Sequence, residues 1–141
     1  MSDIQVDASQ VEELRKKLAR WAKVAPEEVK LALMRAGRLV ENEAKDKHFR
    51  GYKMPRGEGH PTNAWLKVRT DRLRSSIATE VKAFSSGQFS ARVGTTVGYG
   101  RKHELGLEGM PERPFLRPSL EKKRPEVFEE IRKAFMKAYG K

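Results

Sequence analysis

Two short runs of alternating residues, separated by a turn, constrain the fold of this chain most strongly. Apolar and β-branched residues occupy every second position from 77 to 83 and again from 89 to 95. This is the period of a strand that buries one face. Residues 85–88, Ser-Ser-Gly-Gln, supply a turn between the runs. The pattern predicts an antiparallel β-hairpin, which must pack on another element because a lone hairpin is only marginally stable in water.

Amphipathic segments on both sides of the hairpin predict helices. Residues 9–24 open with the capping-box pattern Ser-Gln-Val-Glu and continue with apolar residues at helical spacing. Pro26 suits the first turn of a new helix, so residues 26–48 predict a second, long helix. Near the C-terminus, the sequence predicts a helix that ends at Gly140. It starts at Pro125, or begins near Pro118 and is kinked at Pro125.

The remaining segments predict irregular structure and one minor strand. Residues 49–68 are rich in Gly and Pro and predict a long loop whose far end returns to the core. Phe115 and Leu116 stand between two prolines and predict a short edge strand. The glycines at 94, 98 and 100 predict tight turns after the hairpin.

These elements together predict an α+β fold. We expect one domain over residues 1–141, in which a long N-terminal helix and a C-terminal helix pack on a small antiparallel sheet built around one hairpin. Residues 9–24 are expected to form a helical extension, and residues 49–68 a long loop.

The composition limits the partners and the chemistry. Lys and Arg number 30 against 19 Asp and Glu, a net charge of +11. A basic surface attracts polyanions such as nucleic acid, but it equally suits contacts with acidic subunits. There is no Cys, which excludes disulfides and thiolate nucleophiles. No apolar run approaches the ~20 residues of a membrane span, and residues 1–7 lack the pattern of a secretory signal, so we expect neither.

Motifs for catalysis or metal binding are missing from the sequence. His103-Glu104 resembles the start of a zinc-protease motif, but Leu107 stands where the second His is needed. His60, near Glu58, could add ligands only if the long loop folds over, and otherwise the histidines are expected to be solvated or locally hydrogen-bonded. The sequence also has no nucleophile elbow and no phosphate-binding glycine loop. We therefore expect no catalytic, cofactor or metal site, and a protein that is not an enzyme.

Basic residues bracket the predicted hairpin and leave a second function open. Asp71 interrupts the first cluster, and aromatic residues for stacking on bases are dispersed. A small basic nucleic-acid-binding protein is therefore the alternative to an assembly protein. The residues concerned are Lys67, Arg69, Arg72, Arg74, Arg101 and Lys102.

Three segments, taken in order, resemble one protein family. Residues 70–77 (Thr-Asp-Arg-Leu-Arg-Ser-Ser-Ile) precede the predicted hairpin, and residues 97–106 (Val-Gly-Tyr-Gly-Arg-Lys-His-Glu-Leu-Gly) follow it. Residues 110–120 (Met-Pro-Glu-Arg-Pro-Phe-Leu-Arg-Pro-Ser-Leu) precede the last helix. In order and spacing they resemble the tail-completion, or head–tail joining, proteins of long-tailed double-stranded DNA phages. The similarity covers about residues 28–135. Asp71, Gly100 and Ser119 depart from the Gly, Ala and Ala that are usual in that family.

The resemblance implies a structural virion protein of the phage tail or neck, assembled in the host cytoplasm. Such proteins form a ring, expected to be a hexamer, at the head-proximal end of the tail. The ring completes the tail and joins it to the head. The implied partners are further copies of the chain, the tail tube protein and the head connector protein. DNA only passes through the lumen, no cofactor is needed and no membrane is involved.

A ring subunit needs one apolar surface for its own core and another for its neighbour. On the predicted long helix a second set of apolar residues lies off the main stripe, and it meets either another subunit or the flanks of the same core. The resembling segments supply further interface candidates, for which the alternative is packing within one chain. The candidates are Leu31, Met34, Leu39, Tyr99, His103, Glu104, Pro114 and Phe115. We expect the basic side chains to face acidic partners, because a lumen that lets DNA slide should not hold phosphates tightly.

Overall fold

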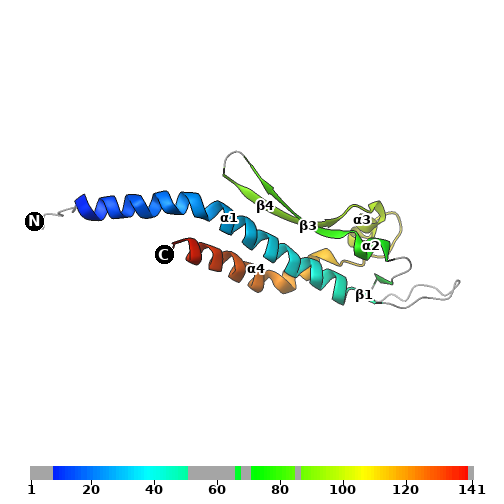
Figure 1. Ribbon diagram of the computed structural model, residues 1–141. Coiled ribbons are helices and arrows are strands. Elements are labelled where there is room, and N and C mark those ends of the chain that lie inside the picture. Colours follow the sequence, from blue (N-terminus) through cyan, green and yellow to red (C-terminus); the bar gives the residue numbers. More distant parts are fainter. Residues whose placement is uncertain (1–7, 51–65, 68–70, 85–86, 140–141) are drawn as a thin grey trace, which may run out of the picture.

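The computed structural model describes residues 8–50, 66–67, 71–84 and 87–139 and confirms the predicted α+β class. Two long helices, α1 (Ala8–Lys47) and α4 (Leu116–Tyr139), run side by side. A hairpin of β3 (Ile77–Ala83) and β4 (Phe89–Thr95) packs on another side of α1 (Figure 1). The short elements are β1 (Phe49–Arg50), β2 (Leu66–Lys67), α2 (Arg72–Ser75) and α3 (Gly98–Leu105).

Helix α1 is continuous, so the prediction of separate helices over 9–24 and 26–48 is wrong. Pro26 lies inside the helix, where it cannot donate to the carbonyl of Ala22. Ala22 is exposed, so water can satisfy that carbonyl. Figure 1 shows that α1 changes direction about midway along its length, as expected for a helix with an internal proline.

Helices α1 and α4 are antiparallel and pack through small residues. Lys137 contacts Glu28 at 2.7 Å, and Lys122 contacts Glu43 at 2.6 Å. Both acids and both lysines are fifteen residues apart (28 to 43 and 122 to 137), so the helices keep one register over about 22 Å. Alanines fill the interface and let the two backbones approach closely: Ala25, Ala32, Ala36 and Ala134 are all buried.

The predicted hairpin is confirmed. Ile77 pairs with Thr95 and Ala83 with Phe89, and the register is unbroken between them. Gly37 of α1 lies directly beneath β3, where an added Cβ would come within 2.2 Å of Cγ2 of Thr79. The hairpin therefore lies so close to α1 that only glycine fits at position 37. The turn residues 85–86 lie outside the described residues.

The largest apolar cluster lies where the C-terminal end of α1, the start of β3 and the start of α4 meet. Its aromatic centre is an edge-on contact between Phe49 and Phe115, whose ring centroids are 5.3 Å apart. The loop prediction over 49–68 needs correction at both ends, because Phe49–Arg50 and Leu66–Lys67 form a parallel two-stranded pair. Residues 51–65 and 68–70 lie outside the described residues. The buried cluster comprises Ala44, Phe49, Leu66, Leu73, Ile77 and Phe115.

Two further local predictions are wrong. Phe115 and Leu116 form no edge strand, since Phe115 immediately precedes α4 and Leu116 begins it. Pro118 and Pro125 both lie within α4, which begins at Leu116 as in the earlier-starting alternative. Gly94 lies in β4, and Gly98 and Gly100 lie in α3, instead of in tight turns after the hairpin. Among the described residues, no helix combines the length and apolar character that crossing a bilayer requires.

Candidate subunit interface

One apolar stripe of α1 is buried along half of the helix and exposed along the other half. Val11, Leu18, Ala25 and Ala32 follow at seven-residue intervals and so share a face. Their exposed fractions are 50%, 47%, 6% and 1% in that order. Leu14, on the same side of the helix, is 54% exposed. The apolar spacing of the buried half therefore continues into the N-terminal half of α1, where no other described element covers these side chains.

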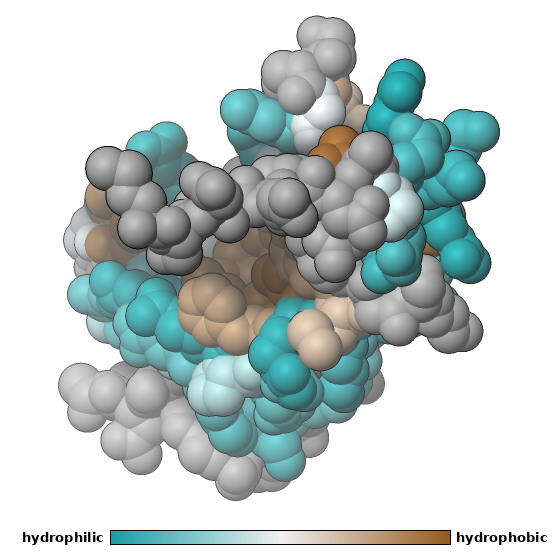
Figure 2. Space-filling model, turned by 90° about the vertical axis from the view of Figure 1, so that its left-hand side faces the viewer, coloured by the Kyte–Doolittle hydropathy of each residue, from teal (hydrophilic) through white to brown (hydrophobic). Residues whose placement is uncertain are grey.

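The change from exposed to buried coincides with the end of α4. Lys137, two residues before the end of α4 at Tyr139, contacts Glu28. Residues 8–24, here called the arm, extend past this point beyond the end of α4 (Figure 1). Figure 2 views the molecule from this end and shows hydrophobic residues in a recess, with hydrophilic ones at its sides and below it. Within the described residues, α4 thus leaves the apolar stripe of the arm uncovered.

A second exposed apolar surface lies on α4. Phe128 and Phe135 are seven residues apart and share one side of the helix. They are 65% and 44% exposed, respectively. Buried Ala134 faces α1, so the two phenylalanines, here called the flank, lie beside the α1–α4 contact. Two large aromatic side chains exposed on one side of a helix make this side a candidate surface for binding another protein.

The interface candidates of α3 and the following segment gather around the start of α4. Backbone N–H groups of Phe115 and Leu116 donate to Oε2 of Glu104 at 2.7 and 2.9 Å. The N–H of Arg117 donates to Oε1 of Glu104 at 2.8 Å. Because the first N–H groups of a helix have no partner within it, this carboxylate caps α4. The contact ties α3 to α4 within one chain.

The other candidates of this region differ in exposure. Phe115 is fully buried, so it cannot touch a neighbouring subunit and could affect an interface only by supporting the residues above it. Pro114 and His103 are half-buried, and Tyr99 is exposed. The rings of Tyr99 and His103 meet edge-on with centroids 6.1 Å apart. Tyr99 is thus the most exposed member of this group and the one most accessible to a neighbouring subunit.

The three candidates on α1 lie apart from that group. Leu31 is exposed, whereas Met34 and Leu39 are half-buried. Leu39 continues the seven-residue series of Ala25 and Ala32, so it lies on the face that packs against α4. Leu31 and Met34 point away from that face. The structure therefore brings together five of the eight candidates and separates the remaining three from them.

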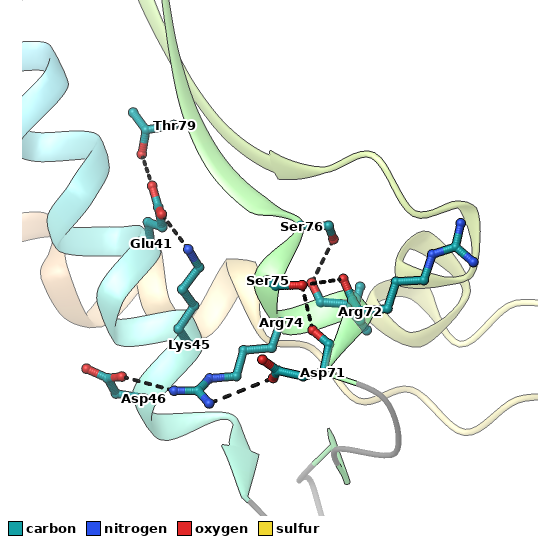
Figure 3. A network of polar contacts seen from close by, with 10 residues as sticks. Glu41, Lys45, Asp46, Asp71, Arg72, Arg74, Ser75, Ser76 and Thr79 are labelled. Atoms are coloured by element: carbon teal, nitrogen blue, oxygen red, sulfur yellow. Dashed lines mark hydrogen bonds and ion pairs between the residues drawn. The ribbon is translucent and has the colours of Figure 1, made fainter.

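Polar contacts join the hairpin and α2 to α1 (Figure 3). Oε2 of Glu41 accepts a hydrogen bond from Thr79 at 2.8 Å, and Oε1 accepts one from Lys45 at 2.6 Å. Burial acts to raise the pKa of Glu41, but these bonds outweigh it and lower the pKa overall. Arg74 lies between Asp46 and Asp71, at 4.0 and 3.8 Å. A basic residue next to the hairpin is therefore engaged within the chain.

Glu43 and His48 lie near the aromatic cluster, and the pKa of each is lowered. The hydrogen bond from Lys122 lowers the pKa of buried Glu43, against the opposite effect of burial. Burial also lowers the pKa of His48, although Glu43 and Glu104 act in the opposite direction. Within the described ranges, no three His, Asp or Glu side chains gather in a geometry suited to a metal ion. His60 lies outside them.

Sequence reasoning missed the arm and the flank as surfaces. Val11, Leu14 and Leu18 have the spacing of an ordinary core face, and Phe128 and Phe135 border the buried face of the last helix. These residues differ from core residues only because the partner helix does not extend over them. The end of that helix cannot be predicted from the local sequence pattern. Comparisons of the chain with models of protein families, with curated proteins and with solved structures found no match.

Proposed function

We propose that this chain is a structural virion protein that forms a ring at the head-proximal end of a phage tail, completing the tail and joining it to the head connector. The observation that carries the proposal is the presence of two separate apolar surfaces, the arm and the flank, that no described part of the chain covers. A closed ring needs a head-to-tail contact, in which two different surfaces of each subunit meet. The resemblance of residues 70–77, 97–106 and 110–120 to tail-completion proteins supports the same function.

In the proposed ring, the arm of one copy packs on the flank of the next. Leu14 and Leu18 of the arm supply the apolar stripe, and Phe128 and Phe135 supply aromatic anchors of the kind that dominate binding energy at interfaces. Each copy then carries one donor and one acceptor surface. The tail tube protein and the connector protein bind the faces of the ring.

The alternative, a nucleic-acid-binding protein, has less support from the described contacts. Arg74 is engaged with Asp46 and Asp71, and Lys102 contacts Glu108. Phosphate tracking requires cations that are free to exchange counterions. Two of the six basic residues that bracket the hairpin therefore have acidic neighbours within the chain, although the Arg74 contacts are exposed and weak.

Complementation between two variants tests the head-to-tail contact. L14D/L18D places two carboxylates in the arm stripe, and F128D places one in the flank, so each variant disrupts one of the two surfaces. Each variant alone should be a folded monomer of 16.1 kDa, whereas the unaltered chain assembles. An equimolar mixture should stop at a heterodimer of about 32 kDa (twice 16.1 kDa), because only one intact arm and one intact flank remain per pair. Size-exclusion chromatography with light scattering measures both masses.

Lys16→Asp is the matched control, since it places a carboxylate on the opposite face of the arm and should leave assembly intact. An unaltered chain that stays monomeric at every concentration, or that is missing from purified virions, would overturn the proposal. Tight DNA binding by the monomer, falling steeply with salt, would instead favour the alternative.

A further inference from the structure

Arg113, in the segment between α3 and α4, is a buried cation without a counterion in the described structure. The residue is 5% exposed, and its Nε makes no hydrogen bond. Its backbone N–H donates to the carbonyl of His103 at 2.7 Å, which fixes the segment against α3. A guanidinium stays protonated under all physiological conditions, so the charge is permanent.

The carboxylates nearest in sequence are engaged elsewhere. Both oxygens of Glu104 accept backbone N–H groups at the start of α4. Glu112 contacts Arg117, and Glu108 contacts Lys102. Within the part of the chain that the structure describes, no carboxylate lies within 4.0 Å of the Arg113 guanidinium. A buried charge left in this state destabilises the fold unless an opposite charge joins it.

We propose that Arg113 is the receptor for an oxyanion, a carboxylate or phosphate group that presents two oxygens to the planar guanidinium. Such paired contacts are the strongest that Arg makes. With so little of the residue exposed, the anion must sit at the end of a slender carrier. A small free anion such as inorganic phosphate meets this requirement, and so does an acidic side chain inserted by a second copy. The phosphate of a DNA duplex, fixed in a broad and stiff backbone, does not.

Thermal unfolding with inorganic phosphate as the probe tests this site. At constant ionic strength, replacing chloride by saturating phosphate should raise the Tm of the unaltered protein by about 5–10 °C. R113M, which keeps an unbranched apolar side chain but is shorter and removes the charge, should lose this shift. In chloride its Tm should equal or exceed that of the unaltered protein, because an unpaired buried charge has been replaced by an apolar group. R92M, on an exposed part of β4, is the matched control and should keep the phosphate shift.

The two sources of the oxyanion give different results. If the anion is free, the phosphate shift appears in the L14D/L18D monomer as well, and R113M assembles normally. If it is an acidic side chain of a second copy, R113M weakens self-association and phosphate competes with association of the unaltered protein. R113K, which keeps the charge without the paired geometry, should retain part of either effect.

The inference is overturned if R113M unfolds well below the unaltered protein in chloride and phosphate shifts both equally. That result would show that the guanidinium is already satisfied within the chain. Failure of R113M to fold would count the same way. Because the phosphate shift is also measured on the monomeric L14D/L18D variant, the test stands even if the ring itself is disproved.

Discussion

Glu104 and Phe115 are joined by a 2.7 Å hydrogen bond in which the Phe115 N–H donates to Oε2 of the carboxylate. Phe115 is fully buried in the aromatic cluster, and its neighbour Leu116 begins α4. The carboxylate of Glu104 in α3 thus holds the first turn of α4 and, through the same contact, the position of the buried Phe115 side chain. The two resembling segments 97–106 and 110–120 are linked through this contact.

We expect Glu104→Ala to lower the free energy of unfolding by about 2–3 kcal/mol, because three N–H groups at the start of α4 lose a charged acceptor. Glu104→Gln keeps one carbonyl oxygen and should cost less. Urea unfolding followed by circular dichroism measures both. Glu121→Ala, an exposed site on α4, is the control and should change stability little. Equal effects of Glu104→Ala and Glu121→Ala would show that the cap contributes nothing.

Asp71 should gain stability when it is replaced by glycine. Its φ of 57° lies in the left-handed region, where a side chain is strained and glycine is not. The lost ion pair with Arg74 is 3.8 Å long and exposed, so it contributes little. We expect Asp71→Gly to raise the free energy of unfolding by about 1 kcal/mol. Asp71→Ala, which keeps a Cβ, should show no such gain. A destabilised Asp71→Gly would mean that the carboxylate matters more than the backbone strain.

Gly37→Ala should disturb the contact between α1 and the hairpin. The new Cβ would lie 2.2 Å from Cγ2 of Thr79, and this overlap outweighs the better helix propensity of alanine. We expect a loss of about 1–3 kcal/mol in chemical unfolding. Gly94→Ala is the matched control, because its Cβ would meet nothing within 4 Å. Should both variants behave alike, the close approach of β3 to α1 would be disproved.

Acid should weaken the α1–α4 contact through Glu43. Its folded-state pKa is lowered, chiefly by the hydrogen bond from Lys122. A group with a depressed folded pKa stabilises the fold above its unfolded pKa of about 4.3, and this stability is lost as pH falls through the folded value. Lys122 is largely exposed, so we expect Glu43→Gln to cost only about 1–2 kcal/mol at pH 7.

Urea unfolding at pH 7, 5, 4 and 3 checks this dependence. The difference in stability between the unaltered protein and Glu43→Gln should shrink below about pH 4 and approach zero once Glu43 is protonated. Glu121→Gln, at an exposed site, should give a small difference that does not change with pH. A Glu43→Gln difference that stayed constant from pH 7 to 3 would exclude the ionised carboxylate as its cause.

Local sequence patterns were sufficient to predict the hairpin and both helical regions, and therefore the α+β class. The alternation over 77–83 and 89–95 fixes which residues face α1, because side chains of a strand alternate between its two faces. The seven-residue series from Val11 to Leu39 likewise marks one face of α1. These features depend on neighbours in the chain, so the sequence contains them directly.

Only the tertiary structure decided what those faces meet. Pro26 is a local signal for a helix start, yet the helix continues through it, since a proline inside a helix bends it and its lost hydrogen bond falls on exposed Ala22. Glu104 caps a helix that begins twelve residues later, a pairing that no periodicity encodes. The stripe of Val11 and Leu18 has the same pattern as that of Ala25 and Ala32, and it is exposed only because α4 ends beside Glu28. Burial is a property of the neighbour that covers a residue, and the position of that neighbour is set by the packing of the whole chain.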